Sequence, residues 1–495
     1  MSFPRSRLVG IIDIGSNSVR LVICEVMGAS ILQSFNEKVM AGLGEGLTKT
    51  GRLSPAGFEA ALSALSRYRA ILRALNVETW QAVATAAVRV AEDGPSFLKR
   101  AGNVLGRPVR LLSGEDEARL SARGVDLSIH NPAGLIGDLG GSSLEFKRIG
   151  QENGPDAGES LMLGPLALGD GINEPKELRK RIREALKAST VMPGTKGRFY
   201  AVGGAWRAFG RLVMEVERYP LHVLQGYQLT EGQVARAAKL CLDSYTNASA
   251  RQMIESIDKK RAKHLPMAAI LMEEILSQSA LESVVISATG VREGVLHDVL
   301  DMPLDDPLTD GIIAYARLDH NQIAFGRALH NFISPALVAQ PDLFGSPAAD
   351  VRIEKAACMM ADSAGRFHPD HRAGMAYDQA LRAPYLGVTH PERAMIAHAI
   401  GCRYDKDFKR PAEHVTLTTE PQAERARQIG LLMRLGAVFS GRSGPILQRA
   451  ALRREGDLLV LEVGRRDAKL ISETVERRLA QAAGQLRLKS GSRVR

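Results

Sequence analysis

The sequence predicts an α/β protein with a mostly helical C-terminal third. Apolar, strand-like runs alternate with helix-like segments over the first 300 residues. From about residue 303 strand signals vanish until 457–463, and helical periodicity dominates. A length of 495 residues suggests roughly three domains. We expect three domains, at residues 1–126, 127–305 and 306–495.

Each element of the α/β part has its own local signal. Two β-branched runs, 8–12 and 19–26, flank a turn and indicate a hairpin. Ser54-Pro55 is typical of a helix start, and apolar residues after it follow helical spacing. Further strands are expected at 79–85, 109–112, 135–139, 199–202 and 284–287. Further helices are expected from 113 to about 125, from 205 and from about 292.

Composition and charge narrow the classes of function. Hydrophobic residues make up 45% and charged residues 24%, which argues against a long disordered tail or a collagen-like repeat. The formal net charge of +10 favours an anionic partner: nucleic acid, a membrane surface or a polyphosphorylated substrate. With 5% aromatic residues and no recognised nucleic-acid motif, we expect no specific nucleic-acid partner.

Cysteine spacing and hydropathy predict a cytoplasmic protein. The four cysteines lie far apart without a CxxC pair, which disfavours a zinc ribbon or a disulfide scaffold and predicts buried, reduced thiols. No apolar stretch approaches the roughly 20 residues that span a bilayer. The N-terminal apolar run is too short for a signal peptide, so we expect no membrane association.

An internal repeat carries the chemistry. Residues 11–19 resemble 136–144 at an offset of 125, and each has a strand, an Asp, a Gly, small polar residues and another strand. Such a turn can cradle phosphate with backbone N–H groups. The Asp at each strand end makes sense if it holds a divalent cation against the phosphate. A single copy would read as an ordinary Gly/Ser turn, whereas two copies predict a clamp on one phosphate chain. The predicted substrate-binding residues of the two turns are Ser16, Asn17, Ser18, Gly140, Gly141, Ser142 and Ser143.

These turns also carry a family resemblance. Residues 13–18 together with 137–145 resemble the exopolyphosphatase/guanosine pentaphosphate phosphohydrolase (Ppx/GppA) phosphatase family. The resemblance implies two duplicated ribonuclease H-like lobes of the actin, Hsp70 and sugar kinase superfamily over roughly residues 8–300. Ser142 departs from it, since the family usually has a third Gly there. Further segments match in order at 42–47, 84–89, 113–118, 201–204 and 287–294.

The resemblance implies hydrolysis of a terminal phosphoanhydride, which needs a positioned water and cations. By motif position, Glu117 would orient and deprotonate the water, and Arg89 would contact the phosphate chain. The magnesium (or manganese) site would be formed by Asp13, Asp138 and Glu145. A competing interpretation is that Glu117 is one of three acids in a helix first turn, where the macrodipole favours negative charge. That position is expected to keep its pKa low, so water positioning would matter more than proton abstraction.

The Gly203-Gly204 pair opens a helix after a strand. It predicts either an anion or nucleotide site or close packing of the lobe against that helix, and both interpretations stay open. Arg207 is a weaker candidate, because a helix-surface arginine is usually solvated.

The C-terminal third resembles the HD-like helical domain of longer family members. The HD metal pair would fall at 360–362, but Ala361 stands where the His belongs, and His368, His371 and His390 form no convincing ligand set. We therefore expect no second metal centre, and a role in binding and homodimerisation. Residues 465–495 carry nine Lys/Arg against three Asp/Glu. They predict either a solvated helix face with a frayed tail or an anion site that extends a channel for a long chain.

The leading functional expectation is a processive exopolyphosphatase. The alternatives are conversion of guanosine pentaphosphate to tetraphosphate, both activities together, or a polyphosphate or alarmone sensor without turnover. Retention of the acidic residues argues against the sensor.

Overall fold

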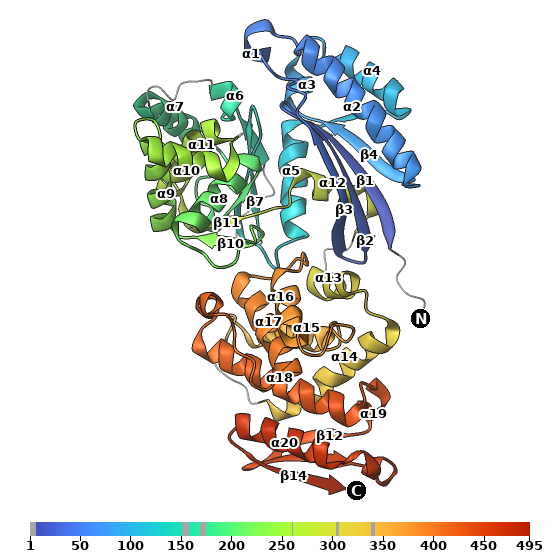
Figure 1. The fold of residues 1–495 in the computed structure, drawn as a ribbon. Coiled ribbons are helices and arrows are strands. Elements are labelled where there is room, and N and C mark those ends of the chain that lie inside the picture. The colour runs from blue at the N-terminus through green and yellow to red at the C-terminus, as the bar shows by residue number, and fades with distance from the viewer. Residues whose placement is uncertain (1–5, 151–157, 169–174, 260, 303–305, 338–341) are drawn as a thin grey trace. The chain divides into compact units, whose positions relative to one another are not determined.

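The computed structural model describes residues 6–150, 158–168, 175–259, 261–302, 306–337 and 342–495 (Figure 1). The chain divides into an N-terminal unit that ends at Pro307 and a C-terminal unit from Leu308 to Arg495. Within the described ranges, no helix combines the length and the apolarity of a bilayer span. The predicted burial of the cysteine thiols is confirmed, and all four are free.

The first sheet of the N-terminal unit has the order β3-β2-β1-β4-β5. Strands β1 to β3 are antiparallel neighbours, whereas β4 and β5 run parallel to β1. Successive residues of β1 point to opposite faces of the sheet. Ile12 belongs to the hydrophobic core that includes α2, and Ile11 belongs to the core that includes α5 and α12. Burial on both faces explains the nearly continuous apolar runs. The strands are β1 Arg7–Ile14, β2 Val19–Met27, β3 Ser30–Val39, β4 Thr79–Ala84 and β5 Arg110–Leu111.

The second sheet repeats this topology with one additional edge strand. Its order is β10-β11-β9-β6-β7-β8, and β6 pairs antiparallel with β7 and parallel with β9. The register also repeats, since Asp13 faces Arg20 and Asp138 faces Glu145. The predicted duplicated fold is therefore confirmed. The strands are β6 Gly134–Leu139, β7 Leu144–Ile149, β8 Gly158–Leu161, β9 Lys196–Val202, β10 Tyr227–Leu229 and β11 Ala280–Ile286.

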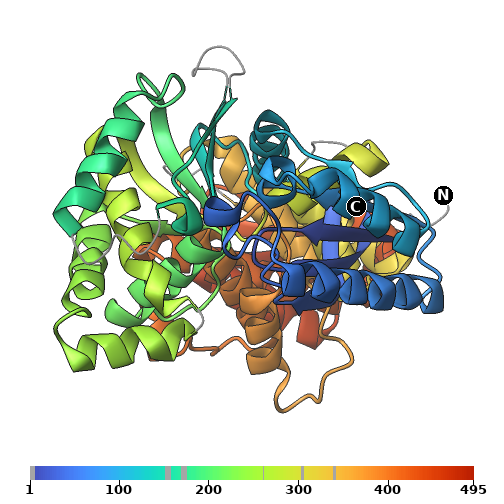
Figure 2. The ribbon, with the colours of Figure 1, turned by 90° about the horizontal axis from the view of Figure 1, so that it is seen from above.

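Helix α5 lies between the two sheets (Figures 1 and 2). Its Leu120 belongs to the core on β1, and its Val125 belongs to the core on β6. The backbones of α12 and α5 are in close contact at Gly294. A Cβ atom at this position would lie 2.0 Å from the Leu120 backbone oxygen. These contacts fix the start of α5 beside both β1–β2 and β6–β7 turns. The helices of this unit are α1 Leu47–Thr50, α2 Pro55–Ala74, α3 Ala86–Val90, α4 Gly94–Leu105, α5 Gly114–Asp126, α6 Pro165–Leu168, α7 Pro175–Lys187, α8 Gly204–Val216, α9 Glu231–Asp243, α10 Ala248–Asp258, α11 Leu265–Ser277 and α12 Val291–Leu300.

The C-terminal unit is mainly helical, as predicted, around two helices that are buried on nearly every side. These are α17 (His390–Tyr404) and α18 (Glu420–Ser440), whose low amphipathicity fits a central position. The other helices are α13 Pro307–Ala316, α14 His320–Ile333, α15 Pro347–Met360, α16 Arg372–Arg382, α19 Gly444–Gln448 and α20 Glu473–Gln485. Short 3-10 helices in the chain lie at 262–264, 334–336, 412–417 and 465–470.

The basic C-terminal segment is not a frayed tail. The predicted strand at 457–463 is confirmed as β13 (Leu458–Val463), but it lies between β12 (Ala451–Glu455) and β14 (Lys489–Val494) in a three-stranded sheet. The sequence did not predict the two outer strands. Cations of β14 and the terminus pair with acids of the other two strands: Arg493 lies 2.7 Å from Glu455 of β12, and Arg495 pairs with Glu462 of β13. The local excess of +6 is therefore partly neutralised.

Deletion of residues 489–495 is expected to lower the Tm of the C-terminal unit by several degrees. The deletion removes a paired strand and leaves Glu462, whose side chain is 5% exposed, without Arg493 and Arg495. Calorimetry checks this. Lys489→Ala is the control, because its pair with Asp457 is largely exposed on both sides and contributes little. An unchanged Tm of the truncated chain would contradict a structural role for β14.

Candidate active site

The two repeated turns face each other. The Gly15 N–H donates to the Ser18 oxygen at 3.0 Å, and the Gly140 N–H donates to the Ser143 oxygen at 2.9 Å. The Ser16 Oγ of the first turn lies 3.5 Å from the Ser142 Oγ of the second. The duplicated sequence thus brings two small, polar hairpin turns together, as a clamp requires.

A cavity lies where the turns meet, and the predicted residues line it. Its volume is about 170 Å³, and it continues into a larger cavity of about 540 Å³ with which it shares part of its wall. The predicted residues that line the first cavity are Asp13, Ser16, Glu117, Asp138, Gly140, Gly141, Ser142, Ser143, Glu145 and Gly203. Those that line only the second are Asn17, Ser18 and Gly204.

Asp13 and Asp138, near the ends of β1 and β6, line both cavities. Burial raises the pKa of each carboxyl; Arg292 and Arg20 oppose this at Asp13, and a hydrogen bond from Ser121 opposes it at Asp138. Two half-buried carboxylates that face one cavity are a donor set that a hard cation neutralises.

The carboxylates fit magnesium in its usual mode. Mg²⁺ is commonly held by one or two carboxylates together with water and substrate phosphates, not by an all-protein cage. Among the described residues, no group of three His, Cys, Asp or Glu side chains converges as a metal cage. Glu145 instead accepts a hydrogen bond from Ser160 Oγ at 3.0 Å, and its pKa is raised by burial and by the charge of Glu117. The metal role of all three acids stays a prediction.

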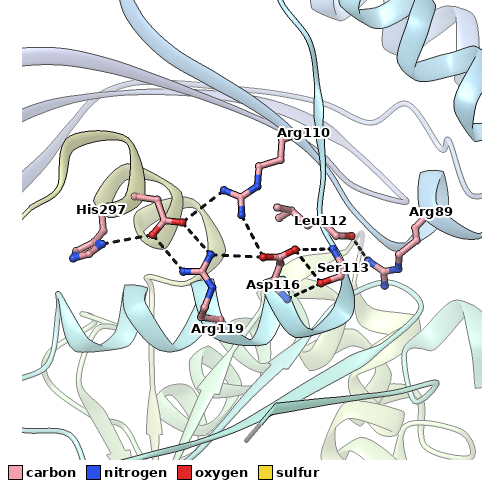
Figure 3. A network of polar contacts seen from close by, with 8 residues as sticks. Arg89, Arg110, Leu112, Ser113, Asp116, Arg119 and His297 are labelled. Atoms are coloured by element: carbon pink, nitrogen blue, oxygen red, sulfur yellow. Dashed lines mark hydrogen bonds and ion pairs between the residues drawn. The ribbon is translucent and has the colours of Figure 1, made fainter. Parts of the chain in front are cut away.

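Glu117 is set apart from its neighbours on α5 by burial. Its residue is 7% exposed, and Arg89 Nη1 donates to its Oε1 at 2.5 Å. Arg89 Nη1 also donates to the Leu112 oxygen at 2.6 Å, which fixes the guanidinium (Figure 3). Arg89 therefore holds Glu117 in place, and it does not itself line either cavity.

The expectation that a helix N-terminus keeps the pKa of Glu117 low is wrong. Burial raises this pKa, the charges of Asp138 and Asp13 act in the same direction, and Arg89 opposes them. The cost of removing the carboxylate from water exceeds the stabilisation from the helix end. Glu117 is consequently a better proton acceptor than the sequence suggested.

The two preceding acids do not reach the cavity. Glu115 is exposed, and Asp116 accepts hydrogen bonds from Ser113 in the capping box of α5. Asp116 also pairs with Arg110 at 3.2 Å, and Arg119 joins this cluster to Asp298 of α12 at 3.0 Å (Figure 3). Asp116 therefore does more than interact with the helix dipole, and Asp298 connects α12 to the start of α5 through Arg119 and Arg110.

A group of cations in the larger cavity was mostly missed from the sequence. Arg207, interpreted as a weak and solvated candidate, lines both cavities, and its Nη1 donates to the Ala288 oxygen at 2.7 Å. Burial lowers its pKa to about 10. Of the four cations that the sequence analysis did not name, two had a signal that could have found them: Arg20 faces Asp13 across the expected hairpin, and Arg292 lies within a matched segment. The full group is Arg20, Lys38, Arg207, Arg261 and Arg292.

Gly203 has the packing role that the sequence left open, and its role in anion binding stays a prediction. Its φ of 112° is in the region that favours glycine, and a Cβ would lie 2.4 Å from the Leu139 oxygen. Close packing against β6 therefore requires glycine. The same residue lines both cavities at the start of α8, and a helix start is a place where backbone N–H groups can donate hydrogen bonds to an anion.

Comparison with known proteins agrees with this geometry. The sequence model of the Ppx/GppA phosphatase family matches residues 22–302. The chain belongs to this family. The C-terminal exopolyphosphatase model matches residues 344–491. As a member of the Ppx/GppA family the protein is a phosphatase, and so a hydrolase.

Individual relatives carry both names of the family. A guanosine-5'-triphosphate,3'-diphosphate pyrophosphatase from Vibrio vulnificus is 23% identical over 479 residues, which is 92% of each chain. The family member from Aquifex aeolicus is 25% identical with a TM-score of 0.53, over 60% of this chain and 99% of that one. An exopolyphosphatase from Cytophaga hutchinsonii is 23% identical with a TM-score of 0.52, over the same shares.

Glu145→Gln is expected to stabilise the folded protein above neutral pH. The pKa of this carboxyl is higher in the folded protein than in the unfolded chain. Its contribution to stability is therefore fully present below the pKa of the unfolded chain, and it is lost as pH rises through the pKa of the folded protein. A glutamine keeps the acceptor for Ser160 without the charge. We expect a gain of about 1–2 kcal/mol at pH 8 and none at pH 4, since one pKa unit corresponds to about 1.4 kcal/mol. Urea unfolding at both pH values measures it; an equal gain at both would contradict the assignment.

Proposed function

We propose that the protein is a Mg²⁺-dependent exopolyphosphatase that releases orthophosphate processively from the end of inorganic polyphosphate. The observation that carries this is the group of five cations beside the carboxylate pair, which continues the phosphate-binding turns into the larger cavity. A polyphosphate carries about one negative charge per unit, so such a cavity can hold the remaining chain between cleavages. Among the described residues that line either cavity there is no Phe, Tyr or Trp on which a nucleobase could stack.

The reaction follows from the placement of Glu117. Its carboxylate accepts a proton from a water whose oxygen attacks the terminal phosphorus, and the bridging P–O bond breaks. The shortened chain leaves with its terminal oxygen negatively charged, and orthophosphate carries the new oxygen. Arg89 orients Glu117, while the turn N–H groups and the hydroxyls of Ser16 and Ser142 bind the terminal phosphoryl oxygens.

Asp13 and Asp138 would hold the magnesium ion. When bound, the ion supplies positive charge against the phosphoryl oxygens. Without it, the two half-buried carboxylates would repel the substrate from the turns that would bind it.

Hydrolysis of guanosine pentaphosphate is the second candidate. The Vibrio vulnificus relative, which spans nearly the whole chain, carries the name of that activity. Both substrates end in a phosphoanhydride, so the same turns and Glu117 would serve either. We further propose that the protein acts in the cytoplasm as a homodimer, which analytical ultracentrifugation of the full chain tests.

Phosphate release decides between the substrates. The full chain is assayed with long-chain polyphosphate and with guanosine pentaphosphate, with magnesium and with EDTA. We expect the higher kcat/KM on polyphosphate and loss of both activities in EDTA. A higher kcat/KM on guanosine pentaphosphate would replace the first candidate by the second, and binding of both without release would make the protein a sensor.

Cleavage of one long chain gives a test of processivity. The expected products at partial turnover are orthophosphate and uncut long chains, with few intermediates on a gel. Lys38→Ala is expected to increase the amount of intermediates, because it removes a cation that lines the larger cavity. Among the described residues, no carboxylate forms an ion pair with this lysine. Glu25→Ala, outside both cavities, is the control. A ladder of intermediates in the wild type would contradict processive action.

A further inference from the structure

Four charged side chains form a closed ring at the start of α5 (Figure 3). They are Arg110 of β5, Asp116 and Arg119 of α5, and Asp298 of α12. Arg110 lies 3.2 Å from Asp116 and 3.6 Å from Asp298. Arg119 lies 3.0 Å from Asp298 and 3.6 Å from Asp116. Each arginine therefore bridges both aspartates, and the ring joins three elements that are far apart in the sequence.

The ring lies outside the two cavities of the site, since none of its four residues lines either of them. Its side chains are between 26% and 37% exposed. Ion pairs that are this accessible to water usually contribute little to stability. The elements that the ring connects are therefore more informative than its contribution to stability.

Asp298 stands at the end of its helix that disfavours negative charge. Helix α12 runs from Val291 to Leu300, so Asp298 is in its last turn, where the helix dipole favours cations. Burial acts to raise the pKa of this carboxyl, but the hydrogen bond from Arg119 and the charges of Arg119 and Arg110 outweigh it and lower the pKa. The two arginines thus stabilise a carboxylate that α12 alone would not favour.

Asp116 connects the ring to the segment that carries Glu117. Its carboxylate accepts hydrogen bonds from the Ser113 N–H at 3.2 Å and from Ser113 Oγ at 2.9 Å. Glu117 is the next residue, and its own N–H donates to the Ser113 oxygen at 3.0 Å. Arg89 holds the Glu117 carboxylate and the Leu112 oxygen. The first turn of α5 is therefore held by Arg89 and, through Asp116, by the ring.

The helix that supplies Asp298 also carries another part of the site. Gly290 and Arg292, at the start of α12, line the first cavity. The two helices are in close contact there, because a Cβ atom on Gly124 of α5 would lie 2.2 Å from the Gly290 oxygen. The ring thus links two helices that each bring a residue to the same cavity.

We propose that Asp298 is a positioning residue of the hydrolytic reaction. Through Arg119 and Arg110, it holds Asp116 in place. The first turn of α5, which carries Glu117, is thereby fixed relative to α12. This inference rests on the role proposed above for Glu117 as the proton acceptor. Placement matters for such a group, since misplacement by about 1 Å can cost about 100-fold in rate.

Steady-state phosphate release by Asp298→Asn tests the proposal, with magnesium and the substrate that the wild type hydrolyses. Asparagine keeps the shape of the side chain and removes its charge. We expect kcat to fall by roughly 10-fold while KM stays within about twofold, because the binding turns are untouched. Asp298→Glu, which keeps the charge, should recover part of kcat. Glu217→Gln is the matched control with wild-type kcat: it removes a 22% exposed carboxylate that pairs with Arg236 outside both cavities.

Two further measurements separate positioning from a general loss of structure. In the Glu117→Gln background, Asp298→Asn should leave the residual kcat unchanged, because a residue that acts through Glu117 has no effect once that carboxylate is gone. Hydrogen exchange of the amides of residues 114–118 should be faster in Asp298→Asn than in the wild type, with exchange in β9 unchanged.

The outcomes distinguish this proposal from the proposed function. Wild-type kcat in Asp298→Asn together with a large loss in Glu117→Gln would overturn the positioning role alone. An equal fold-loss from Asp298→Asn with and without the Glu117 carboxylate, or unchanged exchange of residues 114–118, would also overturn it. Wild-type kcat in both single variants would overturn the proposed role of Glu117 as well.

Discussion

Glu117→Gln is expected to lower kcat for phosphate release by about 10²–10⁴-fold, with a small change in KM. Glutamine keeps the shape and can still accept the hydrogen bond from Arg89 Nη1, but it cannot take a proton from water. The binding turns and the cation group remain intact. Steady-state rates on tripolyphosphate measure the effect, and circular dichroism confirms that the variant is folded.

The neighbouring residue supplies a matched control. Glu115→Gln makes the same chemical change two positions away on α5, at an exposed side chain outside the cavities. We expect wild-type kcat from it. Similar losses in both variants would indicate an effect on α5 or on net charge, and would contradict the assignment of Glu117 as the base.

The pH profile of the wild type gives an independent check on the same carboxylate. The base is active when ionised, so kcat falls as pH drops through its pKa. Since burial raises this pKa, the acidic limb should lie above the value of about 4.3 of an ordinary glutamate. A limb at the ordinary value would mean that the rate-limiting proton acceptor is a solvated group.

The parts of the site that could be predicted from sequence are those encoded locally. Asp13 and Asp138 were found because a strand, a tight turn and a second strand recur at one offset, and a duplicated local pattern produces a duplicated local structure. The helix caps at Ser54 and Ser113 were predictable for the same reason, since a cap depends on residues three positions away.

The rest depends on tertiary contacts that no local pattern records. Arg207 has the sequence context of a surface helix residue, and it is enclosed only because α8 starts between the two cavities. Arg261 comes from a different segment with no signal of its own. The pKa of Glu117 could not be judged either, because the desolvation that raises it comes from elements far away in sequence. Similarly, β14 became recognisable as a strand only through its pairing with β13.

Asp138→Asn is expected to lower activity by roughly 100-fold or more and to weaken its dependence on magnesium, since the ion contributes several kcal/mol of charge stabilisation in such reactions. The residue lies in both cavities, and the isosteric amide removes one of two carboxylates that would hold the ion. Asp13→Asn should behave alike, because the two residues occupy equivalent positions of the repeat.

Stability separates this loss from misfolding. Burial raises the pKa of both carboxyls in the folded protein. The contribution of each carboxyl to stability is therefore fully present below its pKa in the unfolded chain, and it is lost as pH rises through its pKa in the folded protein. Each Asn variant should therefore be at least as stable as the wild type at pH 8 without magnesium, while added magnesium raises the Tm of the wild type more. A loss of activity together with an unchanged magnesium-dependent increase in Tm would mean that the ion binds elsewhere. Ser121→Ala, which removes only the donor to Asp138, should give a smaller loss with the magnesium response retained.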